Sequence, residues 1–479
     1  MMDLFEYFDQ ICKIPRESGN EEGMRKHLLS WAKENGIEAQ RDEAGNIIAR
    51  VPATKGYEDR PSIALQGHMD MVCVKVPGSK HDFTKDPIET EIDGDWLKAK
   101  ETSLGADDGI GVAITMAIFT DKESKHGPLE AIFTFSEETG MDGAFGLDGS
   151  LIKSKNLINL DSEEEGIIYI GCAGGVDLVS DTLLETCPVK KDWKPVKLTI
   201  GGLKGGHSGG DIHLQRLNAV CAMARILCEI GNVGCQFTIA SFNGGTRRNV
   251  IPSTCECTIL VKEINLCTAK QAIENVAEAL KFENKIEEPN LFVKYEEMET
   301  FTADKALSVT SSMSLAGLLF ALPHGVFAMS KALPGIVETS NNLAIVHVSE
   351  DGKAHLEISI RSNIDSAKDY LVKKIATIVS AFGFNYKIGD GYPSWTPDPN
   401  SKLAAFCAKA YEENTGKKPI VTAIHAGLEC GVISSKVPGM DSVSIGPNLV
   451  DIHSTNEKVS ISSAKRTYDF VKHLLAIIE

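Results

Sequence analysis

The stretch SIALQGHMD, residues 62–70, is a short apolar run that ends in a histidine and an aspartate. Two runs of the same kind follow, LEAIFTF at 129–135 and NLINL at 156–160, and the helix-like segment GIGVAITMAIFT at 109–120 lies between the first two. Continuous apolar strands that alternate with helices are typical of a sheet covered on both faces. The pattern therefore predicts an α/β fold with a mostly parallel sheet flanked by helices.

The texture of the sequence changes near residue 187, where the polar segment CPVKKDWKPVK begins. A second Pro/Gly-rich break, GDGYPSWTPDPNSK, occupies residues 389–402, and the α/β alternation returns after it. A chain of 479 residues is also too long for one ordinary hydrophobic core. We predict an α/β domain in two parts, residues 1–187 and 391–479, interrupted by an inserted α+β domain at 188–390.

Composition excludes several classes of partner. The net charge of −17 argues against nucleic acids and anionic membranes. The first residues carry acids where a signal peptide needs a basic region, and the longest uncharged run, 306–330, is too interrupted to span a membrane. The twelve cysteines are scattered and form no CxxC pair. We expect reduced, buried thiols and a cytoplasmic protein.

Acids and imidazoles follow the predicted strands at the points where those strands end. Ligands of open α/β sheets bind beyond the carboxyl ends of the strands, so these side chains are expected to converge. Each one alone is more often a cap or turn residue, and two adjacent glutamates are more often a solvated turn. Together, nitrogen and oxygen donors without cysteine suit Zn²⁺, with Mn²⁺ or Co²⁺ as alternatives. The converging residues are His68, Asp70, Asp107, Asp108, Glu137, Glu138, Asp161 and His453.

With these residues assembled, the chain resembles the co-catalytic dizinc exopeptidases of the aminoacylase and carboxypeptidase G2 class. The similarity is greatest to their aminoacyl-histidine dipeptidase branch, to which VETSNNLA and HAGLECG point. The motifs extend from about residue 65 to 455. They are ALQGHMDMV, SLGADDGIGVA, TFSEETGMDGA, LDSEEEG, GGHSGGDIH, NGGTRRNVIP, VETSNNLA, HAGLECG and the pair SIGP and IHST.

The resemblance implies a role for each residue of the converging set. It implies two Zn²⁺ ions per subunit, with Asp107 bridging them and a cis peptide bond after it. It also implies that Asp70 orients the ligand His68 and that Glu137 is the general base for a water activated by the metal pair. Asp108 departs from the family, where Asn is frequent, which affects only the local charge. The implied ligands are His68, Asp107 and Asp161 for one ion, and Asp107, Glu138 and His453 for the other.

For substrate contacts, the resemblance implies that His207 stabilises the oxyanion from the inserted lid domain. Arg361 would capture a terminal carboxylate and Asn249 would bind the substrate backbone, while Gly427 would line the pocket. His207 could instead be a turn residue, and Arg361 a surface strand residue. A homodimer formed through the inserted domain is compatible with the sequence, so His207 could serve its own or a partner's site.

The activity implied is hydrolysis of dipeptides, including Xaa-His substrates such as carnosine. An N-acyl-amino-acid deacylase or a tripeptidase on the same site is the nearest alternative. A non-catalytic module that binds metal or peptide is a third hypothesis. The presence of every implied ligand and of the base favours an enzyme acting on small peptides, with no nucleic-acid or membrane partner.

Overall fold

The computed structural model describes residues 3–299 and 301–479, which form two compact units. Unit 1 comprises Met1–Cys172, Trp395–Ala423 and Leu428–Glu479, and unit 2 comprises Ala173–Ser394 and Ile424–Gly427. The second unit thus begins earlier and ends later than the insertion that the sequence predicts at 188–390. The role of the insertion as a lid or dimerisation domain stays a prediction.

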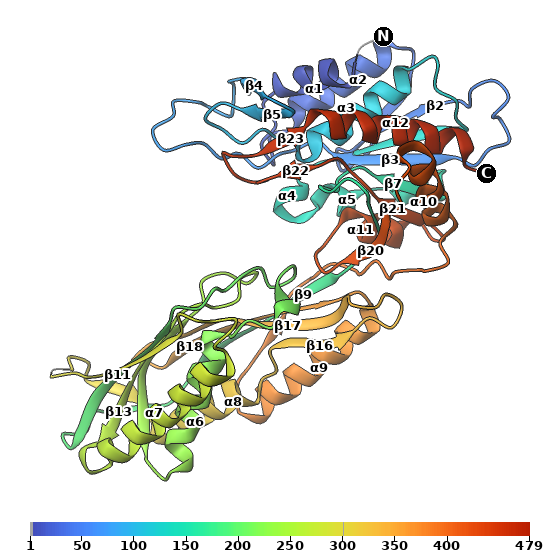
Figure 1. Ribbon diagram of the computed structural model, residues 1–479. Coiled ribbons are helices and arrows are strands. Elements are labelled where there is room, and N and C mark those ends of the chain that lie inside the picture. The colour runs from blue at the N-terminus through green and yellow to red at the C-terminus, as the bar shows by residue number, and fades with distance from the viewer. Residues whose placement is uncertain (1–2, 300) are drawn as a thin grey trace. The chain divides into compact units, whose positions relative to one another are not determined.

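Unit 1 contains two sheets and the helices around them (Figure 1). Its helices are α1 (Leu4–Cys12), α2 (Glu22–Glu34), α3 (Ala106–Thr120), α4 (Glu137–Gly140), α5 (Asp142–Gly146), α10 (Lys402–Thr415), α11 (Glu429–Lys436) and α12 (Ile461–Ile477). Its strands are β1 (Glu38–Arg41), β2 (Ile47–Val51), β3 (Ile63–His68), β4 (Thr90–Asp93), β5 (Trp96–Ala99), β6 (Leu129–Thr134), β7 (Asn156–Asn159), β8 (Ile167–Cys172), β20 (Ile420–Ile424), β21 (Asp441–Ser444), β22 (Leu449–Val450) and β23 (Lys458–Ser460).

The larger sheet of unit 1 has eight strands in the order β1-β2-β6-β3-β7-β21-β8-β20. Its centre is parallel, because β3 pairs in parallel with β6 and β7, and β21 with β7. Its flanks are antiparallel, since β1 pairs with β2, β2 with β6, and β8 with β21 in that sense. The short loop between β1 and β2 permits only antiparallel neighbours. The predicted α/β class is confirmed, and the parallel pairing is confined to the central strands.

Helix α3 is apolar on all sides because it is covered on all sides. It packs against α1, α12 and β3, and only Asp107 and Thr120 of its residues are not fully buried. Its first turn departs from helical geometry at Asp107 and Asp108, and the peptide bond between them is cis, as the resemblance implies. The Asp107 carboxylate at the start of α3 lies 3.0 Å from His68 at the end of β3.

Unit 2 has a nine-stranded antiparallel sheet in the order β14-β11-β13-β12-β17-β18-β9-β19, with β16 beside β17, and a two-stranded sheet of β10 and β15. Its strands are β9 (Gly174–Leu183), β10 (Thr186–Pro188), β11 (Trp193–Gly201), β12 (Phe237–Gly244), β13 (Cys255–Lys262), β14 (Phe292–Glu297), β15 (Lys305–Leu307), β16 (Gly325–Met329), β17 (Val337–Val348), β18 (Lys353–Ser362) and β19 (Lys387–Ile388). Its helices are α6 (Ala219–Asn232), α7 (Leu266–Glu283), α8 (Val309–Ala321) and α9 (Asp365–Ala381).

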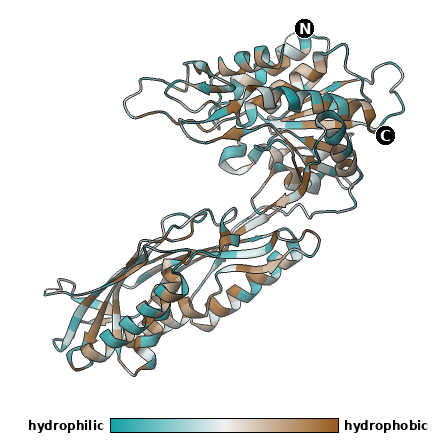
Figure 2. Cartoon of the chain, in the orientation of Figure 1, coloured by the Kyte–Doolittle hydropathy of each residue, from teal (hydrophilic) through white to brown (hydrophobic). Residues whose placement is uncertain are grey.

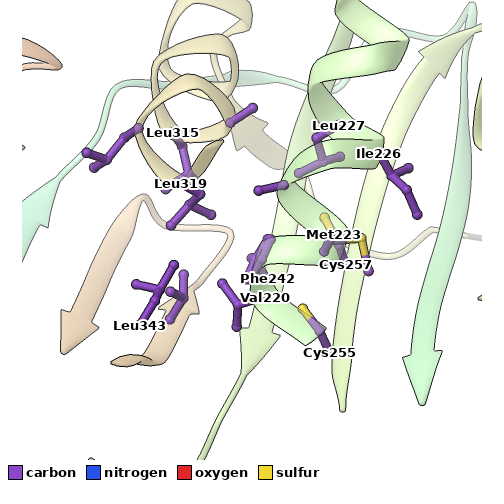
Figure 3. Close-up of a cluster of buried hydrophobic side chains, with 14 of the residues drawn as sticks. Val220, Met223, Ile226, Leu227, Phe242, Cys255, Cys257, Leu315, Leu319 and Leu343 are labelled. Atoms are coloured by element: carbon purple, nitrogen blue, oxygen red, sulfur yellow. The ribbon is translucent and has the colours of Figure 1, made fainter. Parts of the chain in front are cut away.

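Strand β9 belongs to unit 2 because it pairs with β18 along its whole length, from Gly174 opposite Ser362 to Leu183 opposite Lys353. The core of unit 2 lies between the sheet and its helices. Figure 3 shows part of this core, in which α6, α8 and strands β12, β13 and β17 contribute side chains. Those labelled are Val220, Met223, Ile226, Leu227, Phe242, Cys255, Cys257, Leu315, Leu319 and Leu343.

Apolar and polar residues are interspersed along the helices of both units (Figure 2). Across residues 3–299 and 301–479, none of the helices has the length and apolarity that crossing a membrane requires. The apolar part of the run 306–330 forms α8, which ends at Ala321 and buries Leu315, Leu318 and Leu319. All twelve cysteines are free thiols. Seven of them are buried, as the sequence predicts, but four are only partly buried and Cys267 is exposed, so the prediction of burial is wrong there.

Candidate functional site

The carboxyl ends of the central parallel strands of unit 1 lie at one edge of the sheet. Strand β3 ends at His68, β7 is followed closely by Asp161, and β6 leads into α4. The start of α3 and the segment between β22 and β23 reach the same place. The structure thereby brings together five of the predicted residues: His68, Asp107, Glu138, Asp161 and His453.

Asp107 lies between the two imidazoles of this cluster. Its Oδ1 is 3.0 Å from His68 Nε2, and its Oδ2 is 3.0 Å from His453 Nε2. Asp161 Oδ1 lies 3.3 Å from His68 Nε2, and Glu138 Oε1 lies 2.9 Å from His453 Nε2. Two donor sets therefore share Asp107, one on each side of its carboxylate.

This cluster could bind a metal ion. Ligand atoms of His68, Asp107 and Glu138 all lie within 4.8 Å of one another. Hydrogen bonds to Asp107 and Glu138 raise the pKa of His453 to about 11, and burial next to the carboxylates of Asp107 and Glu137 raises the pKa of Asp161 well above its usual range. Imidazole nitrogens and crowded carboxylates that favour added positive charge are the donors expected of a divalent cation site.

Asp70 is buried behind His68 and connects it to the turn after β6. Its Oδ1 lies 3.4 Å from His68 Nδ1, and its carboxylate accepts the N–H groups of Glu137 at 3.1 Å and Glu138 at 3.3 Å. Ser18 Oγ also donates to it, at 2.7 Å. Burial opposes ionisation, but the His68 imidazole beside it and the donors of Ser18 and Glu137 lower the pKa of Asp70 to about 2. An ionised carboxylate next to a ring nitrogen is the kind of group that orients a ligand imidazole.

The adjacent glutamates at the start of α4 have different surroundings. Ser136 before them adopts a left-handed conformation with φ 49° and ψ 39°, and its N–H and Oγ donate to Glu21 Oε1. Glu138 reaches His453, whereas the side chain of Glu137 makes no hydrogen bond or ion pair within the described chain. Burial and the charge of Glu429, against that of His68, raise the pKa of Glu137 to about 8.

Two buried residues that the sequence analysis did not single out fix the loop that carries Asp107. The Glu457 carboxylate accepts the N–H groups of residues 104, 105, 106 and 107 at 2.8, 3.0, 2.7 and 3.4 Å. The Arg16 guanidinium donates to the carbonyls of Met69, Asp70 and Gly105. Neither residue belongs to a local pattern that a single sequence would reveal. The one local hint is that Glu457 lies four residues after His453.

A buried polar network lies beneath the metal-ligand candidates. Glu429 Oε2 accepts hydrogen bonds from Gln66 Nε2 and Thr134 Oγ1, both at 2.6 Å. Gln66 Oε1 accepts from Asn159 Nδ2 at 2.7 Å. Because these side chains cross-link β6, β3, β7 and α11, the network fixes the strand ends relative to one another. Glu429 was not among the predicted site residues, but it lies in the motif HAGLECG, and this motif is the sequence signal that could have identified it.

Unit 2 contains the other predicted site residues. His207 Nδ1 accepts the N–H groups of Gly209 at 3.3 Å and Gly210 at 2.9 Å, which leaves its proton on Nε2. Burial and the cation of Arg361 lower the pKa of His207, which favours the neutral ring. Asn249 is exposed in the loop between β12 and β13, and its carbonyl accepts the N–H of Ser208 at 2.8 Å.

Arg361 and Gly427 lie near a buried histidine that the sequence analysis did not assign. His425 Nε2 is 2.8 Å from Ser340 Oγ, and its Nδ1 is 3.2 Å from Asn363 Oδ1. Burial, with Arg361 nearby, lowers the pKa of His425 to about 3, so this histidine is neutral. The charge of Arg361 therefore acts on the pKa of both His207 and His425.

An α/β sheet whose carboxyl edge gathers imidazoles and carboxylates around a shared aspartate has the architecture of a metallohydrolase. The model of peptidase family M20/M25/M40 matches residues 64–477 of this chain. The chain belongs to this family.

Individual relatives agree with this membership. The cytosol non-specific dipeptidase of Escherichia coli K12 is 42% identical over 473 residues, covering 98% of this chain and 96% of the relative. The crystal structure of aminoacylhistidine dipeptidase from Vibrio alginolyticus superposes with a TM-score of 0.93 at 38% identity, covering 99% of this chain and 96% of that one. A tripeptidase from Staphylococcus aureus, at 17% identity and a TM-score of 0.57 over 99% of this chain and 97% of that one, shares the fold.

Proposed function

We propose that this protein is a cytoplasmic metallo-dipeptidase of broad specificity, which hydrolyses dipeptides including Xaa-His substrates such as carnosine. Membership of the M20/M25/M40 peptidases and near full-length similarity to two dipeptidases support the reaction class. The observation that carries the proposal is the Asp107 carboxylate between His68 and His453, with further carboxylates beside both histidines.

The cluster in unit 1 fits two Zn²⁺ ions, because its donors are imidazole nitrogens and carboxylate oxygens and one carboxylate serves both sets. His68, Asp107 and Asp161 would bind one ion, and Asp107, Glu138 and His453 the other; Mn²⁺ and Co²⁺ are alternatives. Bound ions of this kind supply an activated water and polarise the peptide carbonyl. Asp70 would fix the ring of His68 through Nδ1.

Glu137 would act as the general base and then the general acid. Its carboxylate lies beside the metal-ligand candidates without a partner of its own in the described residues, so it is free to accept a proton from the attacking water and deliver it to the leaving amine. His207 would donate a hydrogen bond from Nε2–H to the developing oxyanion, a role consistent with the tautomer that its Nδ1 contacts select.

Substrate binding would use residues of unit 2. Arg361 suits bidentate capture of the terminal carboxylate, and the exposed side chain of Asn249 can hydrogen-bond the substrate backbone. Gly427 would line the pocket. A homodimer through unit 2 is part of the proposal, and the source of His207, own subunit or partner, is to be tested with it.

A substrate panel tests the function. Purified protein loaded with Zn²⁺, Mn²⁺ or Co²⁺ is assayed by amine release from β-Ala-His, Gly-His and other dipeptides, from tripeptides and from N-acetyl-amino acids, with metal content measured in parallel. Hydrolysis of the dipeptides supports the proposal. Hydrolysis confined to tripeptides or to acetylated amino acids would replace it with a tripeptidase or a deacylase, and bound metal without any turnover would indicate a binding module.

A further inference from the structure

Tyr392 lies in the Pro/Gly-rich segment between β19 and α10, opposite the glycine-rich start of β9. Its N–H donates to the carbonyl of Gly175 at 2.8 Å, and its carbonyl accepts the N–H of Gly175 at 3.1 Å. The same carbonyl accepts a hydrogen bond from Lys368 Nζ at 2.8 Å. The backbone of Tyr392 is thus fixed from two directions.

The ring of Tyr392 occupies a slot that two glycines leave open. A Cβ atom on Gly175 would lie 2.6 Å from Tyr392 Cε1, and a Cβ atom on Gly427 would lie 2.9 Å from Tyr392 Cε2. Both distances are shorter than non-bonded carbon atoms permit, so any side chain at either position would displace the ring. Glycine at 175, inside the motif GCAGG, and at 427, inside HAGLECG, therefore defines the position of this tyrosine.

The hydroxyl group at the end of this ring contacts Arg361. Arg361 Nη1 donates a hydrogen bond to Tyr392 Oη at 2.8 Å. Arg361 Nε is buried, and within the described residues neither it nor Nη2 has a hydrogen-bond partner. Nε and Nη2 form the edge of a guanidinium that binds a carboxylate with two parallel hydrogen bonds. Tyr392 therefore occupies Nη1 and leaves Nε and Nη2 without a partner among the described residues.

We propose that Tyr392 is a positioning residue, which orients the Arg361 guanidinium through its hydroxyl so that the Nε–Nη2 edge captures the carboxylate of a dipeptide. This role rests on the proposed function and deepens it. It gives a structural basis for the substrate class, which is peptides whose free carboxylate belongs to the residue after the scissile bond. Gly175 and Gly427 contribute to this role because they lack the side chains that would displace the tyrosine ring.

The test compares the wild-type protein with Tyr392→Phe, which retains the ring and removes only the hydroxyl. For Gly-His, the variant should raise KM about tenfold, because a hydrogen bond to a charged group is lost, while kcat and bound metal stay within about twofold. Its preference for Gly-His over the C-terminal amide of the same dipeptide should fall by a similar factor. Tyr370→Phe, on the exposed face of α9, is the matched control and should leave all these values unchanged.

A double-mutant cycle separates positioning from a structural role. In the Arg361→Ala background the Tyr392→Phe change should have no further effect on KM, because there is no guanidinium left to orient. Gly175→Ala, which displaces the ring, should reproduce the KM increase. An unchanged KM and amide discrimination in Tyr392→Phe, or equal effects with and without Arg361, would overturn the positioning role. Absence of dipeptide hydrolysis by the wild-type protein would instead overturn the proposed function, and this role with it.

Discussion

Glu137 and Glu138 are neighbours in sequence whose carboxylates have different surroundings. The left-handed Ser136 before them and the N–H contacts to Asp70 fix the turn, so that Glu138 contacts His453 and Glu137 contacts no donor within the described chain. The roles that we propose for them, metal ligand for Glu138 and general base for Glu137, are therefore not interchangeable. We therefore expect that Glu138 is required for metal binding and that Glu137 is required for turnover.

Glu137→Gln is expected to keep the bound metal and lose about 10²–10⁴-fold in kcat, because an amide has the shape of the base but cannot accept its proton. Glu138→Gln is expected to lose metal, because it removes a charge next to His453. Metal content by mass spectrometry and kcat on Gly-His measure both effects. Full activity in Glu137→Gln, or full metal occupancy in Glu138→Gln, would contradict the assignment of base and ligand.

At the scale of elements, the start of α3 and the segment carrying His453 are held together by one carboxylate. Glu457 accepts N–H groups of residues 104–107 and is only 2% exposed. These N–H groups belong to the first turn of α3 and the loop before it, where no carbonyl of the helix can reach them, and the positive end of the helix dipole favours the negative charge. The position of Asp107 therefore depends on Glu457.

Glu457→Gln should weaken metal affinity about 10–100-fold, the range typical of groups that orient metal ligands. The cause is that an amide presents one oxygen where the carboxylate presents two. Competition with a chromophoric chelator measures the affinity directly. Asp451→Asn, an exposed change in the same segment, is the control and should bind metal like the wild type. Equal affinities for Glu457→Gln and Asp451→Asn would show that the capping contacts do not position Asp107.

The contrast between these elements shows what sequence alone could predict. Strands such as 62–67 and 129–135, and the acids and imidazoles at their ends, follow from local patterns, and the structure places those residues together. Glu457 contacts backbone separated from it by 351 residues, and Tyr392 meets Arg361 through a slot between two distant glycines. Contacts of this kind depend on tertiary packing and leave no periodic signal in one chain.

At the scale of the whole molecule, the two units have separate cores and separate parts of the proposed chemistry. All five metal-ligand candidates lie in unit 1, whereas Leu343 and the rest of the cluster around it form the core of unit 2. A ligand that binds only the native state stabilises the part of the chain that forms its site. Metal binding should therefore stabilise unit 1 selectively.

Calorimetry with and without chelator is expected to resolve this selectivity as two unfolding transitions. At a metal concentration of about 100 times Kd the stabilisation is about 2.7 kcal/mol, which corresponds to a rise of about 5–10 °C in the Tm of unit 1. The other transition should stay fixed with metal and fall in Leu343→Ala, because that change leaves a cavity in the core of unit 2 and costs about 2–5 kcal/mol. Glu138→Gln should abolish the metal-dependent shift. A single transition that moves with both metal and Leu343→Ala would show instead that the two units unfold as one cooperative structure.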